Sequence, residues 1–96
     1  MALNFKISVH RNSDNLHLKL MGDFDGSSAH QLLNTLKTNS RGASNIFIHT
    51  SCLKHIDPFG RTTFHDNIRQ FKKAPLRLVF TGDNSEELAP EGATLF

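Results

Sequence analysis

Four residues near the middle of the chain have side chains that could act together in catalysis. Ser51 and Cys52 are potential nucleophiles. His55 is a potential base, and Asp57 could orient it. Catalytic triads are defined by geometry rather than by sequence order, and the chain lacks the G-x-S-x-G turn that exposes a nucleophile. We therefore expect no enzyme, and we expect Cys52 to be a small buried side chain at a strand end.

Asp23 and Asp25 are a second candidate, because two closely spaced carboxylates can bind a metal ion or act as acid and base. No recognisable motif ties a third acid or a histidine to them, and turn formation and helix capping explain them better. His49, His55 and His65 lack the short paired spacing of structural zinc sites. The chain also has no glycine-rich phosphate loop, so we expect no metal and no cofactor.

Composition limits the class of protein. The 96 residues suit a single domain, residues 1–96, whose core needs no metal or disulfide. No stretch approaches the ~20 apolar residues of a membrane span, and the first residues enter an alternating pattern without a signal peptide. With a single cysteine, these features predict a cytoplasmic protein that does not insert into a membrane.

Charge and aromatic content indicate no nucleic-acid partner. The formal net charge is only +2. A basic cluster late in the chain, made of Arg69, Lys72, Lys73 and Arg77, has no interleaved aromatic rings on which bases could stack. The aromatic rings are eight phenylalanines, which are expected to serve mainly the core.

Four segments have the pattern of strands. Residues 5–9 and 16–20 alternate apolar with polar side chains around a polar turn, which predicts an antiparallel hairpin. Glycines and acids at residues 22–26 are expected to end the second strand. Residues 45–50 and 76–81 predict two further strands, the first of them central in the sheet.

Two amphipathic helices are predicted between these strands. The first is expected to begin at Ser28, which heads a capping box, and to end near residues 39–42. Asp57 is a good N-cap and Pro58 suits the first helical position, so a second helix is expected over residues 58 to about 73. A short third helix is expected at residues 85–88.

The order strand, strand, helix, strand, helix, strand, with a short final helix, predicts an α/β fold with a four-stranded mixed sheet. Right-handed crossovers place both long helices on one side of the sheet, and the last three strands are expected to be parallel. The junctions after the second and third strands then emerge together at the sheet edge where ligands and partners bind. The polar face of the first two strands is expected to be open to water.

This order of elements and two short motifs together resemble the STAS domain family, named after sulfate transporters and anti-sigma factor antagonists. Gly22-Asp23-Phe24-Asp25 is similar to the family's Gly-Glu-Leu-Asp. Asp57-Pro58-Phe59-Gly60 is similar to its Asp-Ser-Ser-Gly. The resemblance runs from about Phe5 to Thr81. It implies a non-enzymatic regulatory domain that binds a protein partner through the second motif and the helix after it.

The resemblance also implies a specific change in regulation. In the bacterial antagonists, the serine after the motif aspartate is phosphorylated by the kinase that is also the anti-sigma factor, and the added charge expels the partner. Pro58 stands at that position and Phe59 at the next. The usual phospho-switch is therefore predicted to be absent, and Thr62 and Thr63 are the alternative phosphosites.

The predicted partner is an anti-sigma factor or kinase-like protein, or a component of a membrane transporter assembly, and a homodimer remains an alternative. Phe59 is expected to anchor the interface, the alternative being that its ring folds back onto the core. A nucleotide or small anion held at the second helix by Arg61 is an alternative function. The predicted partner-binding residues are Asp23, Asp25, Ser27, Asp57, Pro58, Phe59, Gly60, Arg61 and Thr62.

Overall fold

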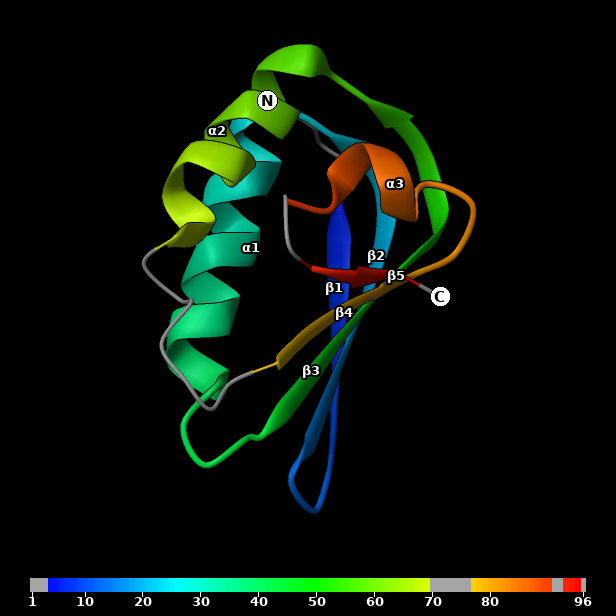
Figure 1. Ribbon diagram of the computed structural model, residues 1–96. Coiled ribbons are helices and arrows are strands. Elements are labelled where there is room, and N and C mark those ends of the chain that lie inside the picture. Colours follow the sequence, from blue (N-terminus) through cyan, green and yellow to red (C-terminus); the bar gives the residue numbers. More distant parts are fainter. Residues whose placement is uncertain (1–3, 70–76, 91–92, 96) are drawn as a thin grey trace.

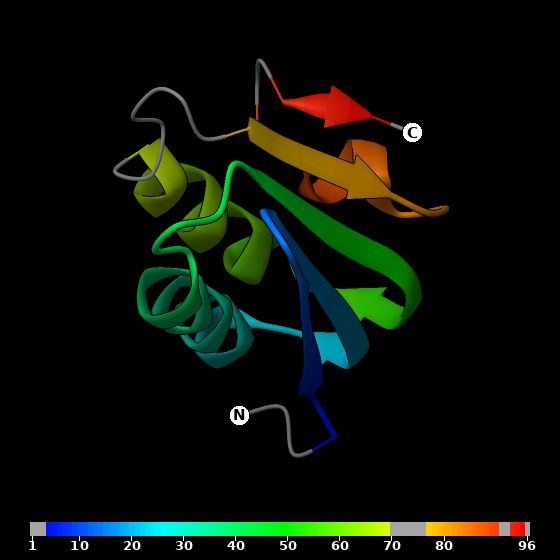
Figure 2. The same cartoon turned by 90° about the horizontal axis from the view of Figure 1, so that it is seen from below.

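A computed structural model of the protein describes residues 4–69, 77–90 and 93–95. Within them the strands form one mixed sheet, and helices α1 and α2 pack against one of its faces (Figure 1, Figure 2). The elements in chain order are β1 (Lys6–Asn12), β2 (Asn15–Phe24), α1 (Gly26–Asn39), β3 (Asn45–Ile56), α2 (Pro58–Ile68), β4 (Arg77–Thr81), α3 (Ser85–Leu88) and β5 (Thr94–Leu95).

The sheet has the spatial order β1-β2-β3-β4-β5. β1 and β2 form the predicted antiparallel hairpin, while β2, β3 and β4 run parallel with β3 in the centre. The predicted mixed α/β fold is thus confirmed, but the described sheet has five strands rather than four. β5 pairs with β4 over only two residues, which is too short for an alternating pattern to reveal.

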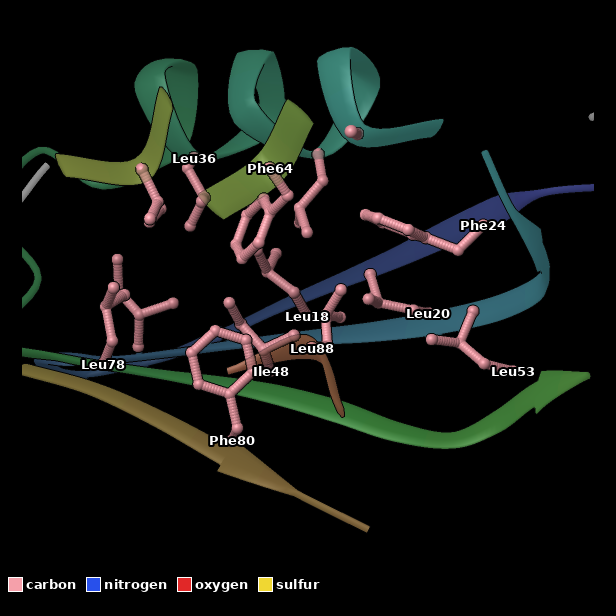
Figure 3. Close-up of a cluster of buried hydrophobic side chains, with 14 of the residues drawn as sticks. Leu18, Leu20, Phe24, Leu36, Ile48, Leu53, Phe64, Leu78, Phe80 and Leu88 are labelled. Atoms are coloured by element: carbon pink, nitrogen blue, oxygen red, sulfur yellow. The ribbon is translucent and has the colours of Figure 1, made fainter. Parts of the chain in front are cut away.

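The hydrophobic core lies between the sheet and the α1–α2 layer (Figure 3). Leu18, Leu20 and Ile48 project into it from the sheet, and Leu36 and Phe64 from the helices (Figure 3). α3 adds Leu88, which is fully buried.

The phenylalanines do not all serve this core. Phe24, Phe64 and Phe80 are fully buried, and Phe24 and Phe80 each make an edge-to-face contact with Phe64. Phe47 lies half-buried on the opposite face of the sheet, and Phe59 is exposed. The expectation that the rings serve mainly the core is therefore wrong for these two.

β3 is much longer than the strand expected at residues 45–50. Its register against β2 shifts twice, between the pairs Lys19–His49 and Met21–Cys52 and again after Gly22. Each shift places an extra residue in β3, as in a β-bulge. The bulges break the apolar alternation after Thr50, which is why the sequence pattern ends the strand too early.

The first junction also differs from the prediction. β2 continues through Gly22 to Phe24, because these residues stay paired with Leu53–Ile56 of β3. Gly22 has a φ of 93°, and the Asn4 carbonyl approaches it closer than a Cβ would allow. α1 begins at Gly26 and is capped by the Asp25 carboxylate rather than by Ser28. Asp25 precedes Ser28 by one helical turn and is itself a preferred cap, so the earlier start prevails.

α2 begins as predicted, with Asp57 as N-cap and Pro58 in its first turn. The described helix ends at Ile68, whereas the prediction extended it to about residue 73. Residues 70–76 lie outside the described part, and with them the predicted roles of Lys72 and Lys73 and of Pro75 as a helix stop. None of the described helices has the length and apolar character needed to cross a bilayer.

Candidate functional site

The β2–α1 and β3–α2 junctions meet at one edge of the sheet. The backbone N–H of Asp57 donates to the carbonyl of Phe24 at 2.8 Å, which joins the end of β2 to the residue that caps α2. The expectation that the two junctions emerge side by side is thus met. We call the surface formed by residues 23–28 and 57–62 the junction surface.

Gly60 holds the two junctions close together. A Cβ atom at this position would lie 2.6 Å from the carbonyl carbon of Asp25 and 2.7 Å from its oxygen. Both are backbone atoms in a capped helix start, so they cannot move away cheaply. The motif glycine is therefore required by the close approach of α2 to the backbone that precedes α1.

The Phe59 side chain lies over the contact between the two junctions, and its ring points outward. The side chain is 70% exposed, although Cε2 and Cδ2 lie so close to Gly26 that a Cβ there would be 2.7 Å and 2.9 Å away. The alternative that the ring folds into the core is therefore wrong. The sequence analysis did not identify Gly26 as the residue against which this ring packs. The only signal in the sequence was that a glycine directly follows Asp25, the last residue of the first motif.

Asp25 is fixed by the hydrogen bonds that start α1. Its Oδ1 accepts from the Ser28 backbone N–H at 2.9 Å and from the Ser28 hydroxyl at 3.0 Å. The backbone hydrogen bond from Ser28 stabilises the charged form and lowers the pKa of Asp25 below its usual value. Ser28 is buried, and its hydroxyl oxygen also lies 2.9 Å from the carbonyl oxygen of Asp23, so the one hydroxyl hydrogen can be donated to either acceptor and the cap lies beside the end of β2.

Asp57 occupies the start of α2 with its own carboxylate. Oδ1 of Asp57 accepts from the Phe59 backbone N–H at 2.9 Å, and the Asp57 carbonyl accepts from the Arg61 N–H at 3.0 Å. A negative charge thus already interacts with the positive end of the helix dipole. An external anion at this point would meet that carboxylate, whereas Arg61 is half-buried at the next turn.

The remaining predicted contact residues divide by exposure. Ser27, Pro58 and Thr62 are exposed on the junction surface, whereas Asp23 is half-buried. Thr63 is half-buried beside the buried Phe64. Of the two alternative phosphosites, Thr62 is therefore the more exposed.

The structure does not assemble the candidate catalytic groups. Ser51, Cys52 and His55 are exposed on the distal part of β3, and no hydrogen bond among the described residues links them to one another or to Asp57. The expectation that Cys52 is buried is wrong, because it lies in the bulged region where alternation fails. Within the described ranges, no three acids, histidines or cysteines are grouped to hold a metal ion.

Several solved structures resemble this fold. The anti-sigma factor antagonist SpoIIAA in its unphosphorylated form matches with a TM-score of 0.69 and 14% identity, over 96% of this chain and 86% of that one. An uncharacterized protein of the DUF3478 family from Shewanella loihica PV-4, which has a SpoIIAA-like fold, matches with a TM-score of 0.64 and 15% identity, over 97% of this chain and 85% of that one.

The third structure, Mglu, matches with a TM-score of 0.68 and 21% identity over 90% of this chain, but over only 20% of its own. The same fold is thus a small part of a longer protein there. No protein-family model and no curated protein sequence matches the chain. The structural likeness shows that the chain has the SpoIIAA-like fold of STAS domains, as the motifs and the order of elements predict.

Proposed function

We propose that residues 1–96 form a single STAS-like regulatory domain of the cytoplasm that binds a protein partner through the junction surface without catalysis. The observation that carries the proposal is Phe59, whose ring is 70% exposed at the start of α2. A large apolar side chain held outward in one place is typical of an interface anchor. The likeness to the antagonist SpoIIAA supports the same class of function.

The proposed surface is rigid as well as apolar at its tip. Pro58 fixes the first turn of α2, Gly60 packs against the Asp25 backbone, and both helix starts are capped by aspartates. A rigid surface loses little conformational entropy on binding, so a small contact can still give useful affinity. The residues proposed to contact the partner are Asp23, Asp25, Ser27, Asp57, Pro58, Phe59, Gly60, Arg61 and Thr62.

Our proposal does not include regulation of binding by phosphorylation of the residue after Asp57. Neither Pro58 nor Phe59 has a hydroxyl group to modify. A phosphate there would add up to about two negative charges and repel a docked partner. We therefore propose a module that binds constitutively, or one that is controlled at another residue such as Thr62.

The partner we propose is an anti-sigma factor or kinase-like protein, with a transporter component or a second copy of the chain as the alternatives. Binding of a nucleotide or free anion at the start of α2 has less support. The Asp57 carboxylate already accepts from the Phe59 N–H, so an incoming phosphate would face a like charge.

The proposal is tested by affinity capture from the native cell with three variants beside the wild type. Phe59→Ala removes the proposed anchor, and Asp57→Ala removes the α2 cap. Val9→Ala is the matched control, because Val9 is 45% exposed on β1 and lies outside the junction surface. Circular dichroism and thermal unfolding establish that each variant is folded.

A specific partner should be recovered with the wild type and with Val9→Ala, and at least tenfold less with Phe59→Ala. Asp57→Ala should reduce recovery less, because the loss of an N-cap costs about 1 kcal/mol and leaves the ring in place. If folded Phe59→Ala recovered as much partner as the wild type, the junction surface would not be the binding site.

A further inference from the structure

Three histidines and a phenylalanine gather on the face of the sheet opposite the helices. The register pairs His17 of β2 with His10 of β1 and with Phe47 of β3. It also places His49 of β3 between Lys19 of β2 and Thr81 of β4. Because side chains alternate along a strand, this cluster lies on the sheet face opposite the core residues Leu18 and Ile48, outside the junction surface. Helices α1 and α2 cover the core face (Figure 2).

Two of these rings form one flat, hydrogen-bonded unit. His17 Nδ1 lies 3.0 Å from His49 Nε2, and the two ring planes differ by only 2°. Phe47 stacks on His17 with the ring centroids 4.7 Å apart and the planes 9° apart. The stacking and the hydrogen bond fix the orientation of both imidazoles.

The second nitrogen of His49 extends the hydrogen bonding to β4. His49 Nδ1 lies 2.6 Å from the Thr81 hydroxyl oxygen, so both nitrogens of this ring are engaged. The described residues supply no hydrogen-bond partner for His17 Nε2. Because no buried side-chain nitrogen or oxygen in that part of the chain lacks a partner, His17 Nε2 must reach water.

Hydrogen-bond rules limit how many protons this unit can hold. Between His17 Nδ1 and His49 Nε2, one nitrogen must carry hydrogen and the other must accept it. A single added proton satisfies this rule, since charged His17 can donate to neutral His49, which in turn donates to Thr81. Protonating both rings would place two N–H groups against each other and break the contact.

We propose that Thr81, His49 and His17 form a proton relay that takes up one proton, held by His17 with Nε2 toward water, while His49 stays neutral. The His17–His49 pair thereby gains a single positive charge as the pH falls through the range in which histidines titrate. A second proton enters only at lower pH, at the cost of the cross-strand hydrogen bond.

The electrostatic surroundings support this order. Burial lowers the pKa of His49, and the charges of His17 and Lys19 lower it further. His10, on the neighbouring strand, has its ring centroid 6.4 Å from that of His17 and is a further ionisable side chain of this face. Arg77 of β4 is farther along the sheet, and Asp23 lies at the opposite end of β2 from His17, so no acid of these strands offsets the cluster.

Imidazole nitrogen NMR on the 96-residue chain tests the proposal directly. Spectra recorded from about pH 8 to about pH 5 report which ring nitrogens carry hydrogen and in what order they gain it. The wild type should show His49 neutral with hydrogen on Nδ1 while His17 charges. His17→Gln keeps a polar side chain but removes the competing charge, so the His49 midpoint should rise by roughly half to one pH unit.

His30→Gln is the matched control, because His30 is exposed on α1 in the other layer. It should leave the midpoints of His17 and His49 unchanged. Three results would overturn the relay: the two rings taking up protons together, His49 charging before His17, or a His49 midpoint that is the same in His17→Gln as in the wild type.

Discussion

The ring of Phe59 rests on Gly26, where a Cβ atom would lie 2.7 Å from Cε2 of the phenylalanine. The second residue after the N-cap of α2 therefore packs against Gly26, the first residue of α1. This contact orients a ring that is otherwise 70% exposed. The glycine of one junction thus determines how the apolar tip of the other is presented.

Replacing Gly26 should change the orientation of the Phe59 ring without lowering the stability of the fold, so the two effects can be measured separately. Gly26→Ala should displace the Phe59 ring, which can swing into solvent, and partner capture should fall severalfold. The free energy of unfolding should stay the same or rise by up to about 1 kcal/mol, because alanine suits a helix better than glycine. Urea unfolding and affinity capture measure the two effects.

Asn34→Ala, at an exposed position of α1 outside the junction surface, is the control for helix composition. If Gly26→Ala captured as much partner as the wild type, the contact between Phe59 and Gly26 would have no influence on binding.

Gly60→Ala should act on stability instead. Its Cβ would lie 2.6 to 2.8 Å from backbone atoms of Asp25, and backbone in a capped helix start cannot yield as a side chain can. Overpacking of this kind typically costs 1 to 3 kcal/mol, so we expect a loss of about 2 kcal/mol in urea unfolding.

Asn34→Ala on the exposed face of α1 should change the unfolding free energy by less than about 0.5 kcal/mol. A Gly60→Ala protein as stable as this control would show that the two junctions can separate freely.

Stability should fall with acid in two separate pH ranges. The pKa of His49 is lowered from 6.5, so below that pH the unfolded chain binds more protons and stability is lost until the folded pKa is passed. The pKa of Asp25 is lowered from 3.8, so its contribution is present above that value and disappears as the pH falls through the folded pKa.

Urea unfolding over a series of pH values checks both signs. His49→Gln should flatten the dependence in the first range, and Asp25→Asn should do so in the second. A wild-type protein that becomes more stable between neutral pH and pH 5 would contradict the assignment to His49.

Thr62 and Thr63 should respond differently to an introduced charge. Thr62 is exposed on the junction surface, so Thr62→Glu should reduce partner capture while leaving the protein folded. Thr63 is half-buried, so Thr63→Glu should lower the thermal unfolding temperature. Thr62→Val supplies the uncharged control, and a loss of capture equal to that of Thr62→Glu would assign the effect to the hydroxyl group rather than to charge.

Much of the fold could be predicted because its signals are local. Alternation identified parts of β1 and the first half of β2, and helical spacing identified α1 and α2. Asp57 with Pro58 located the start of α2 correctly. The end of β3 could not be predicted, because its bulges depend on the register against β2 and on the backbone at Gly22. Ser28 was mistaken for a cap because a hydroxyl and a carboxylate one turn apart are both good caps.

The sequence could predict only those features of the site that follow from the spacing of residues along the chain. The two motifs indicated which junctions meet, but the seat of Phe59 on Gly26 depends on the angle between two helices. The His17–His49 pair was missed for a similar reason. Their adjacency arises from the parallel register of β2 and β3, and neither residue has a partner nearby in sequence.

The most direct test of the central claim is site-specific photo-crosslinking in the native cell. A benzoylphenylalanine is placed at position 59, or at position 9 as a control on β1, and crosslinked products are identified by mass spectrometry. Our account predicts a defined protein product from position 59 alone, suppressed by excess wild-type protein but not by Phe59→Ala. The same products from both positions, or equal suppression by Phe59→Ala, would contradict it.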